Sequence, residues 1–143
     1  LERRYLKLRG IIMGERIHVL SKFDPKVGHL HTDKGSVLEM SGNKGAFEAY
    51  ELLLGALSHC LFATFKSLAE KMQVQYESVV MEIVGVKRDE KVALLETVQL
   101  DVGVKSVSDE SKFKRAFEIA TRYCSVFQTL SKVATLNWTI KFS

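Results

Sequence analysis

The longest apolar stretch of the chain runs from Glu51 to Met72 and predicts a central helix. The stretch consists mainly of helix-forming residues and contains no proline. Over its first four turns the apolar residues cover almost the whole circumference, whereas a helix at a protein surface carries one apolar stripe. Polar residues such as His59 and Lys66 interrupt the run well short of the ~18 apolar residues that indicate a membrane span. We therefore expect a core helix that needs cover on every side.

The residues before this helix alternate in short runs between turn signals, which is typical of an antiparallel meander. In the segment RIHVLSKF, Ile17 and Val19 fall on one face. Asp24-Pro25-Lys26 is a turn sequence, because proline favours the second position of a turn. The expected strands are residues 4–12, 16–23, 28–32 and 36–40, and residues 41–49 form the loop that leads into the helix.

After the helix the apolar period changes from 3.6 to 2, which indicates strands. Residues 78–86 and 92–104 alternate on either side of the turn Arg88-Asp89-Glu90 and predict a hairpin whose second strand is half-buried. Further expected elements are a helix with its N-cap at Ser108 and its end near Tyr123, a short helix over residues 126–133 with its cap at Ser125, and a strand over residues 136–142.

The order of these elements predicts an α+β fold in which helices pack on antiparallel sheet. One small sheet covers only one side of a helix that is apolar all round. A homodimer that wraps a second sheet around two central helices would supply the missing cover, so we expect a dimer. The length suits one domain over residues 1–143. Met13-Gly14 would make a natural start, so residues 1–12 could include upstream or added sequence.

Composition and charge narrow the class of protein. The 143-residue chain is 46% apolar and 27% charged, which is ordinary for a folded soluble protein. Its net charge of +4 comes from basic residues interleaved with acids, so we expect no nucleic-acid partner. We recognise no signal peptide or membrane segment, and we expect no membrane partner. With two cysteines and no export signal, the expected compartment is the reducing cytoplasm, where a paired cysteine more often has a redox than a structural role.

The two cysteines are the main candidates for chemistry. Cys60 lies in the middle of the central helix, where the simplest interpretation is a small buried hydrophobe. Cys124 precedes the short helix, whose dipole would favour a thiolate there. Their separation of 64 residues matches no metal motif. They are therefore either a peroxidatic and resolving pair or two unrelated core residues.

Three histidines and one glutamate are the other candidates. His59 points about 100° away from Cys60 around a helix, so it is poorly placed to act as its base. Glu51 opens the central helix, where the helix dipole alone explains a carboxylate; the functional alternative is a carboxylate that orients a cation near the thiol. His29 and His31 share one strand face, but two ligands without a third do not define a metal site.

Two cysteine motifs in this order resemble the OsmC/Ohr family. The first is ELLLGAL, residues 51–57, followed by Cys60; the second, after a hairpin, is RYCSV, residues 122–126, before a closing strand. The resemblance covers residues 48–142 well and the N-terminal meander loosely. It implies an intertwined α+β homodimer with antiparallel sheets around long central helices. Many members are cytoplasmic thiol peroxidases that act on organic hydroperoxides at the dimer interface.

The resemblance also implies a reaction. Cys60 would be the peroxidatic cysteine, and its thiolate would attack the peroxide and become a sulfenic acid. Cys124 would be the resolving cysteine and would condense with that acid to a disulfide. An external dithiol of dihydrolipoyl type would reduce the disulfide by exchange. No metal or bound cofactor is needed.

A carboxylate and an arginine beside the thiol are further implied by the resemblance. Established peroxidases of the family carry a Pro-Glu pair at the helix start, with the glutamate ten positions before the cysteine. Here Ala49 and Tyr50 hold those positions, and Glu51 lies nine before Cys60, which changes its direction by about 100°. Arg16 is the nearest candidate for the arginine. The second motif resembles the less characterised OsmC-like branch.

A second hypothesis belongs to another class of function. Under this hypothesis the protein is a dimeric binding module whose apolar cleft holds a lipid-like or aromatic ligand, and the cysteines have no role in its function. The peroxidase hypothesis predicts that Cys60→Ser abolishes peroxide reduction. The binding hypothesis predicts a copurified ligand and unchanged binding in either cysteine variant.

Overall fold

A computed structural model describes residues 7–8, 11–12 and 15–143 of the chain. These residues belong to two compact units, of which the first ends at Glu51 and the second begins at Leu52. The single domain expected over residues 1–143 stays a prediction.

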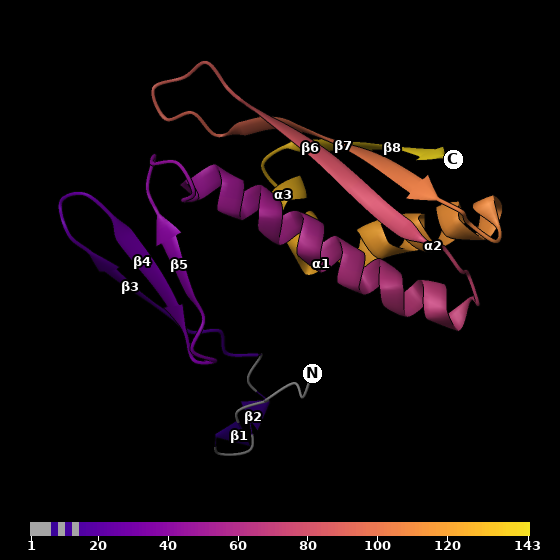
Figure 1. Cartoon of the computed structure of the whole chain (residues 1–143), viewed down its shortest axis with the longest axis horizontal. Helices are drawn as coiled ribbons and strands as arrows, with labels where there is room; N and C mark the ends of the chain where they lie inside the picture. Colours follow the sequence, from indigo (N-terminus) through magenta and orange to yellow (C-terminus); the bar gives the residue numbers. More distant parts are fainter. Residues whose placement is uncertain (1–6, 9–10, 13–14) are drawn as a thin grey trace. The chain divides into compact units, whose positions relative to one another are not determined.

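The first unit contains the predicted meander. Its three strands pair antiparallel in chain order (Figure 1). The Asp24 side chain accepts the backbone N–H groups of Lys26 and Val27 at 2.8 and 3.1 Å, which holds the first turn. The strands are β3 (Val19–Phe23), β4 (Gly28–Thr32) and β5 (Val37–Met40).

Two short strands precede the meander. β1 (Lys7–Leu8) pairs antiparallel with β2 (Ile11–Ile12), so these residues do not continue one another as the single strand expected over residues 4–12. The other residues of that range lie outside the described part of the chain. β3 begins at Val19, three positions after the expected start.

The second unit combines one sheet with helices on one of its sides. Figure 1 shows α1, α2 and α3 on the same side of β6, β7 and β8. The predicted order of elements is confirmed, and the chain has the predicted α+β fold. The elements are α1 (Ala49–Lys71), β6 (Ser78–Lys87), β7 (Leu95–Lys105), α2 (Glu110–Tyr123), α3 (Ser125–Ser131) and β8 (Thr135–Phe142).

The last strand corrects the prediction of purely antiparallel sheet. β6 and β7 are antiparallel, but β8 runs parallel to β7, with Leu100 opposite Trp138. Parallel neighbours need a crossover connection, and α2 with α3 provides it. β7 also begins at Leu95 and not at Val92, since the N–H of Leu94 bonds to the Val92 carbonyl and forms a turn.

The core of the second unit is formed by aromatic residues between α1, α2 and β8. Phe65 of α1 is fully buried, and its ring lies 4.5 Å from that of Phe113 on α2. The Phe117 ring lies 5.1 Å from Trp138 on β8. The predicted inward direction of Trp138 is thus confirmed. Through these ring contacts α2 packs against both the central helix α1 and strand β8 of the sheet.

One chain buries a stripe of α1 and not its whole circumference. The fully buried residues occur at every fourth position, which is the spacing of one helix face. Ala56 and Ala63 are exposed, and the residues from Leu52 to Leu54 are half-buried. By length and composition α1 is apolar enough to cross a membrane, a criterion that core helices of soluble proteins also meet. The buried residues are Leu57, Leu61, Phe65 and Ala69.

The start of α2 lies one residue later than predicted. Asp109 is the N-cap, and its carboxylate accepts the Lys112 N–H at 2.9 Å. Ser108 instead bonds twice to the segment before β6, since its hydroxyl accepts the Gln75 N–H at 2.9 Å and its N–H donates to the Gln75 carbonyl at 2.8 Å.

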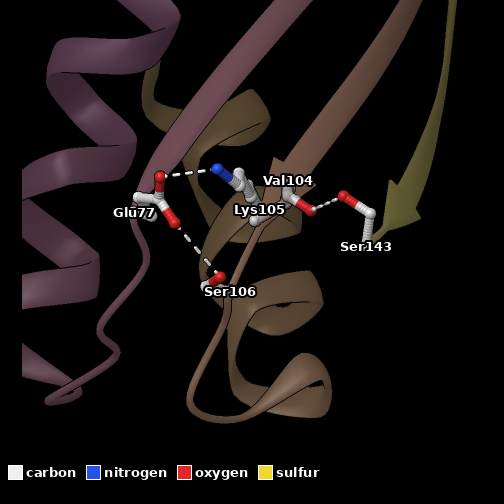
Figure 2. A network of polar contacts seen from close by, with 5 residues as sticks. All are labelled: Glu77, Val104, Lys105, Ser106 and Ser143. Carbon is white, nitrogen blue, oxygen red and sulfur yellow. Dashed lines mark hydrogen bonds and ion pairs between the residues drawn. The ribbon is translucent and has the colours of Figure 1, made fainter.

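A polar network joins the start of β6, the end of β7 and the C-terminus at one end of this sheet (Figure 2). Lys105 Nζ lies 2.8 Å from a Glu77 carboxylate oxygen, and the Ser106 hydroxyl donates to the other oxygen at 3.2 Å. The Ser143 N–H donates to the Val104 carbonyl at 2.9 Å. The charged pair is exposed, so it fixes the geometry of the strand ends more than it stabilises the fold.

Candidate functional site

Cys60 lies on α1 at the border of its buried stripe. It follows Leu57 by three positions and precedes Leu61 by one, and both leucines are fully buried. Cys60 itself is half-buried. The Thr64 hydroxyl donates to the Cys60 carbonyl at 2.9 Å, so it bonds within the helix and not to the sulfur. The thiol is therefore held on a rigid element while part of it stays accessible.

Cys124 connects α2 to α3 in an extended conformation, with φ −74° and ψ 112°. Its N–H donates to the Ala120 carbonyl at 2.8 Å and completes the last turn of α2. Its sulfur accepts the Phe127 N–H at 3.4 Å, which makes Cys124, and not Ser125 as predicted, the N-cap of α3. Cys124 has no exposed surface. A buried thiol thus lies at the N-terminal end of the short helix.

The fold brings the two cysteines together although 64 residues separate them. The Cys60 and Cys124 thiols are neighbours, and each affects the pKa of the other through a hydrogen bond. The backbone amide of Val126 lowers the pKa of both thiols, and the Ser125 hydroxyl lies 3.9 Å from Cys60 Sγ. The start of α3 therefore places two thiols and several hydrogen-bond donors in one cluster.

Opposite effects act on the pKa values of the two thiols. For Cys60, burial raises the pKa, but hydrogen bonds from Val126, Cys124 and Ser125 together hold it below the ordinary 9.0. For Cys124, burial and the neighbouring Cys60 raise the pKa to about 11. Cys60 is consequently the thiol that ionises first, and Cys124 is the thiol that keeps its proton.

Glu51 lies in the first turn of α1 and is exposed. Its carboxylate accepts the backbone N–H of Glu48 at 2.9 Å. A glutamate at the third helical position that bonds back to the cap residue is one half of a capping box. This contact is the one expected of a helix-capping residue, and the catalytic role of Glu51 stays a prediction.

Arg16 and the strand histidines lie in the first unit. Arg16 is exposed and precedes β3, and its catalytic role also stays a prediction. His29 is opposite Lys22 and Glu39 in the sheet register. His31 lies two residues further along β4, and no three His, Cys, Asp or Glu residues of the described chain form a group that could hold a metal.

Ser125 is the site residue that the sequence did not reveal. Its position after Cys124 identified it as a possible helix cap, but its hydroxyl lies beside Cys60 of another helix. The pairing of α3 with α1 is a tertiary contact, and nothing in the local sequence around Ser125 indicates it.

The model of the OsmC-like protein family matches residues 42–139. The chain belongs to the OsmC-like protein family. This match includes both cysteines and confirms the resemblance that their motifs indicated. Membership in the family supports a peroxide-related redox role. A comparison with curated proteins finds no match.

Solved structures of this family share the fold at low sequence identity. The OsmC-like protein of Mycoplasma pneumoniae has a TM-score of 0.81 at 16% identity and covers 91% of this chain and 99% of its own. The organic hydroperoxide resistance protein OhrB of Bacillus subtilis has a TM-score of 0.68 at 14% identity, with coverages of 88% and 98%. The organic hydroperoxide resistance protein OsmC of Legionella pneumophila has the same score and identity, with coverages of 87% and 96%.

Proposed function

We propose that the protein is a thiol peroxidase that reduces organic hydroperoxides, with Cys60 as the peroxidatic and Cys124 as the resolving cysteine. One observation carries the proposal: a half-buried thiol with a lowered pKa contacts a buried thiol whose pKa is raised to about 11. The similar structures from Bacillus subtilis and Legionella pneumophila, both named for organic hydroperoxide resistance, support the substrate class.

The first step oxidises Cys60. Its thiolate attacks the terminal oxygen of the hydroperoxide, the O–O bond breaks, and an S–O bond forms. The sulfur loses two electrons and becomes a sulfenic acid. The alkoxide leaves and takes up a proton, which gives the alcohol.

The second step forms the disulfide. The Cys124 sulfur attacks the Cys60 sulfur, the S–O bond breaks, and the hydroxyl group leaves as water with the proton of Cys124. Because Cys124 is buried and its pKa is raised, it does not compete with Cys60 for peroxide. The two thiols are already neighbours, so the reaction needs little rearrangement.

The remaining partners follow from the same proposal. A dithiol of dihydrolipoyl type reduces the disulfide by exchange and is itself oxidised to a cyclic disulfide. The protein acts as a cytoplasmic homodimer without a membrane or nucleic-acid partner. The exposed and half-buried apolar residues of α1 support the dimer, because a second copy would cover them.

Glu51 and Arg16 are proposed as the supporting carboxylate and cation. Arg16→Ala would then slow the reaction of Cys60 with hydroperoxide, and Glu51→Gln would do so less strongly. Unchanged second-order rates in both variants would remove these two residues from the catalytic assignment and leave the cysteine pair unaffected.

Steady-state turnover of an organic hydroperoxide with a dithiol reductant tests the proposal. We expect no turnover in Cys60→Ser and a single turnover or a slow cycle in Cys124→Ser. Ser131→Ala, a change at an exposed residue of α3 whose hydroxyl bonds to the Gln128 carbonyl, is the control and should retain wild-type turnover. Full turnover in Cys60→Ser would contradict the proposal.

Binding of an apolar ligand is the second candidate function. Phe62 on α1 and Val79 and Met81 on β6 line an open hollow of about 310 Å³ together with Ser58 and His59. If this hollow is the functional site, the purified protein should take up an apolar fluorescent probe with equal affinity in the wild type and in Cys60→Ser. Probe binding that is absent from both proteins would eliminate this candidate.

A further inference from the structure

We propose that the Ser125 hydroxyl donates a hydrogen bond to the Cys60 thiolate and thereby activates the reactive thiol. The inference deepens the proposed function and rests on the assignment of Cys60 as the residue that attacks the peroxide. It adds to the site a neutral donor that neither the sequence motifs nor the family match assigns.

The geometry places the hydroxyl beside the sulfur without a competing role in the helix. Ser125 is the first residue of α3, and its Oγ lies 3.9 Å from Cys60 Sγ. Cys124 caps the helix through its own sulfur, so the Ser125 side chain is not the group that holds the helix start. The Ser125 carbonyl accepts the Thr129 hydroxyl at 2.8 Å, which fixes the residue within the first turn.

The protonation states of the two groups determine which of them donates the hydrogen bond. A thiolate has no proton, so the serine must be the donor when Cys60 is ionised. Hydrogen bonds to an ionised acceptor are shorter and stronger than those to a neutral one. A separation of 3.9 Å is long for a neutral pair, and we expect it to shorten when the charge forms.

Ser125 also remains available throughout the cycle. The Cys124 thiol is the titratable group that interacts with Cys60, but it loses its proton when the disulfide forms. His59, the adjacent titratable residue of α1, points about 100° away around the helix. In the exchange, one thiol of the dithiol attacks the accessible Cys60 sulfur and Cys124 leaves. The second thiol of the reductant then attacks its own sulfur in this mixed disulfide, and Cys60 leaves as a thiolate that the Ser125 hydroxyl is still in place to stabilise.

The test compares Ser125→Thr with Ser125→Val, which have nearly the same shape and differ in the hydroxyl. Alkylation of Cys60 by iodoacetamide, measured over a pH series with mass-spectrometric site assignment, gives the ionisation midpoint of this thiol in the full-length protein. We expect Ser125→Thr to keep the wild-type midpoint and Ser125→Val to raise it by about 0.5–1 pH unit, a three- to tenfold smaller thiolate fraction at neutral pH. Ser131→Ala is the control and should leave the midpoint unchanged.

The outcomes separate this inference from the proposed function. Equal midpoints in Ser125→Thr and Ser125→Val, with normal peroxide-driven disulfide formation, would overturn the role of Ser125 and leave the peroxidase standing. A raised midpoint in Ser125→Val, in a protein whose wild type forms no disulfide with hydroperoxide, would support the role of Ser125 and overturn the peroxidase. If Ser125→Val fails to fold, Ser125→Ala replaces it in the same comparison with the wild type.

Discussion

The sulfur of Cys124 accepts the backbone N–H of Phe127 at 3.4 Å, so the buried cysteine caps α3 while it contacts Cys60. A residue proposed for redox chemistry therefore has a structural role at the same atom. Any substitution at Cys124 changes both roles unless the new side chain also caps the helix.

Serine and alanine at position 124 separate the two roles. Serine is a strong N-cap and alanine a poor one, so Cys124→Ser should be more stable than Cys124→Ala by about 1 kcal/mol in the free energy of unfolding. Urea unfolding of both variants measures the difference. Neither variant can form the disulfide, so a lower stability of Cys124→Ser would show that the cap contact contributes nothing.

The two thiols should react with iodoacetamide in a fixed order. The pKa of Cys60 lies below 9.0, whereas that of Cys124 is raised to about 11 and its side chain is fully buried. At pH 8, Cys60 should be modified first, and Cys124 should react only in denaturant. Site-specific mass spectrometry follows both reactions, and faster modification of Cys124 in the native protein would contradict this assignment.

The raised pKa of Cys124 also predicts how stability depends on pH. Folding favours its protonated form, because the pKa in the folded state is about 11 and the ordinary value is 9.0. The contribution is complete below pH 9 and is lost as the pH rises toward 11. Chemical unfolding of the reduced protein between pH 8 and pH 11 should show a fall in stability that is smaller in Cys124→Ser.

Much of this fold was predictable because its signals are local. The central helix, the hairpin after it and the amphipathic face of α2 each follow from apolar periodicity within one segment. The direction of β8 was not predictable in this way, because its alternating pattern is the same for parallel and antiparallel pairing. Its neighbour is decided by the crossover through α2 and α3, which is a property of the tertiary structure.

The two cysteines of the site could be predicted from the sequence, but the contacts around them could not. The sequence identified the two cysteines as candidates, either a redox pair or two unrelated core residues, and the fold brings them together. The cap at Cys124 was missed because cysteine is an uncommon N-cap and the adjacent Ser125 is a preferred one. The contact of Ser125 with Cys60 depends on how α3 packs beside α1, which no local pattern contains.

A charged residue on the open face of α1 tests the proposed homodimer. Ala56 and Ala63 are exposed in the single chain, so Ala56→Glu or Ala63→Glu should leave the folding of a monomer intact. If α1 lies in the dimer interface, the wild type should sediment at twice the 16.2 kDa of one chain, and either variant should dissociate.

Ser111→Glu introduces the same charge at an exposed residue of α2 and is the control for the dimer test. Ser111→Glu should sediment at the same mass as the wild type. A monomeric wild type at micromolar concentration would contradict the expected dimer.

The aromatic core gives the largest expected loss of stability. Phe65 is fully buried, and its ring lies 4.5 Å from Phe113, 5.6 Å from Tyr76 and 6.0 Å from Phe117. Phe65→Ala should lower the free energy of unfolding by about 3–5 kcal/mol, because it removes these contacts and leaves a cavity. Val80→Ala, at a residue that is 67% exposed on β6, is the control and should change it by less than about 1 kcal/mol.

The most direct test of the cysteine pair is thiol mapping after exposure of the reduced protein to one equivalent of an organic hydroperoxide. We expect an intramolecular disulfide between Cys60 and Cys124 within seconds, which makes the chain about 2 Da lighter because two thiol hydrogens are lost. A dithiol should reverse the change. If both thiols remain reduced, the protein has the fold of the family without this chemistry, and the peroxidase assignment is wrong.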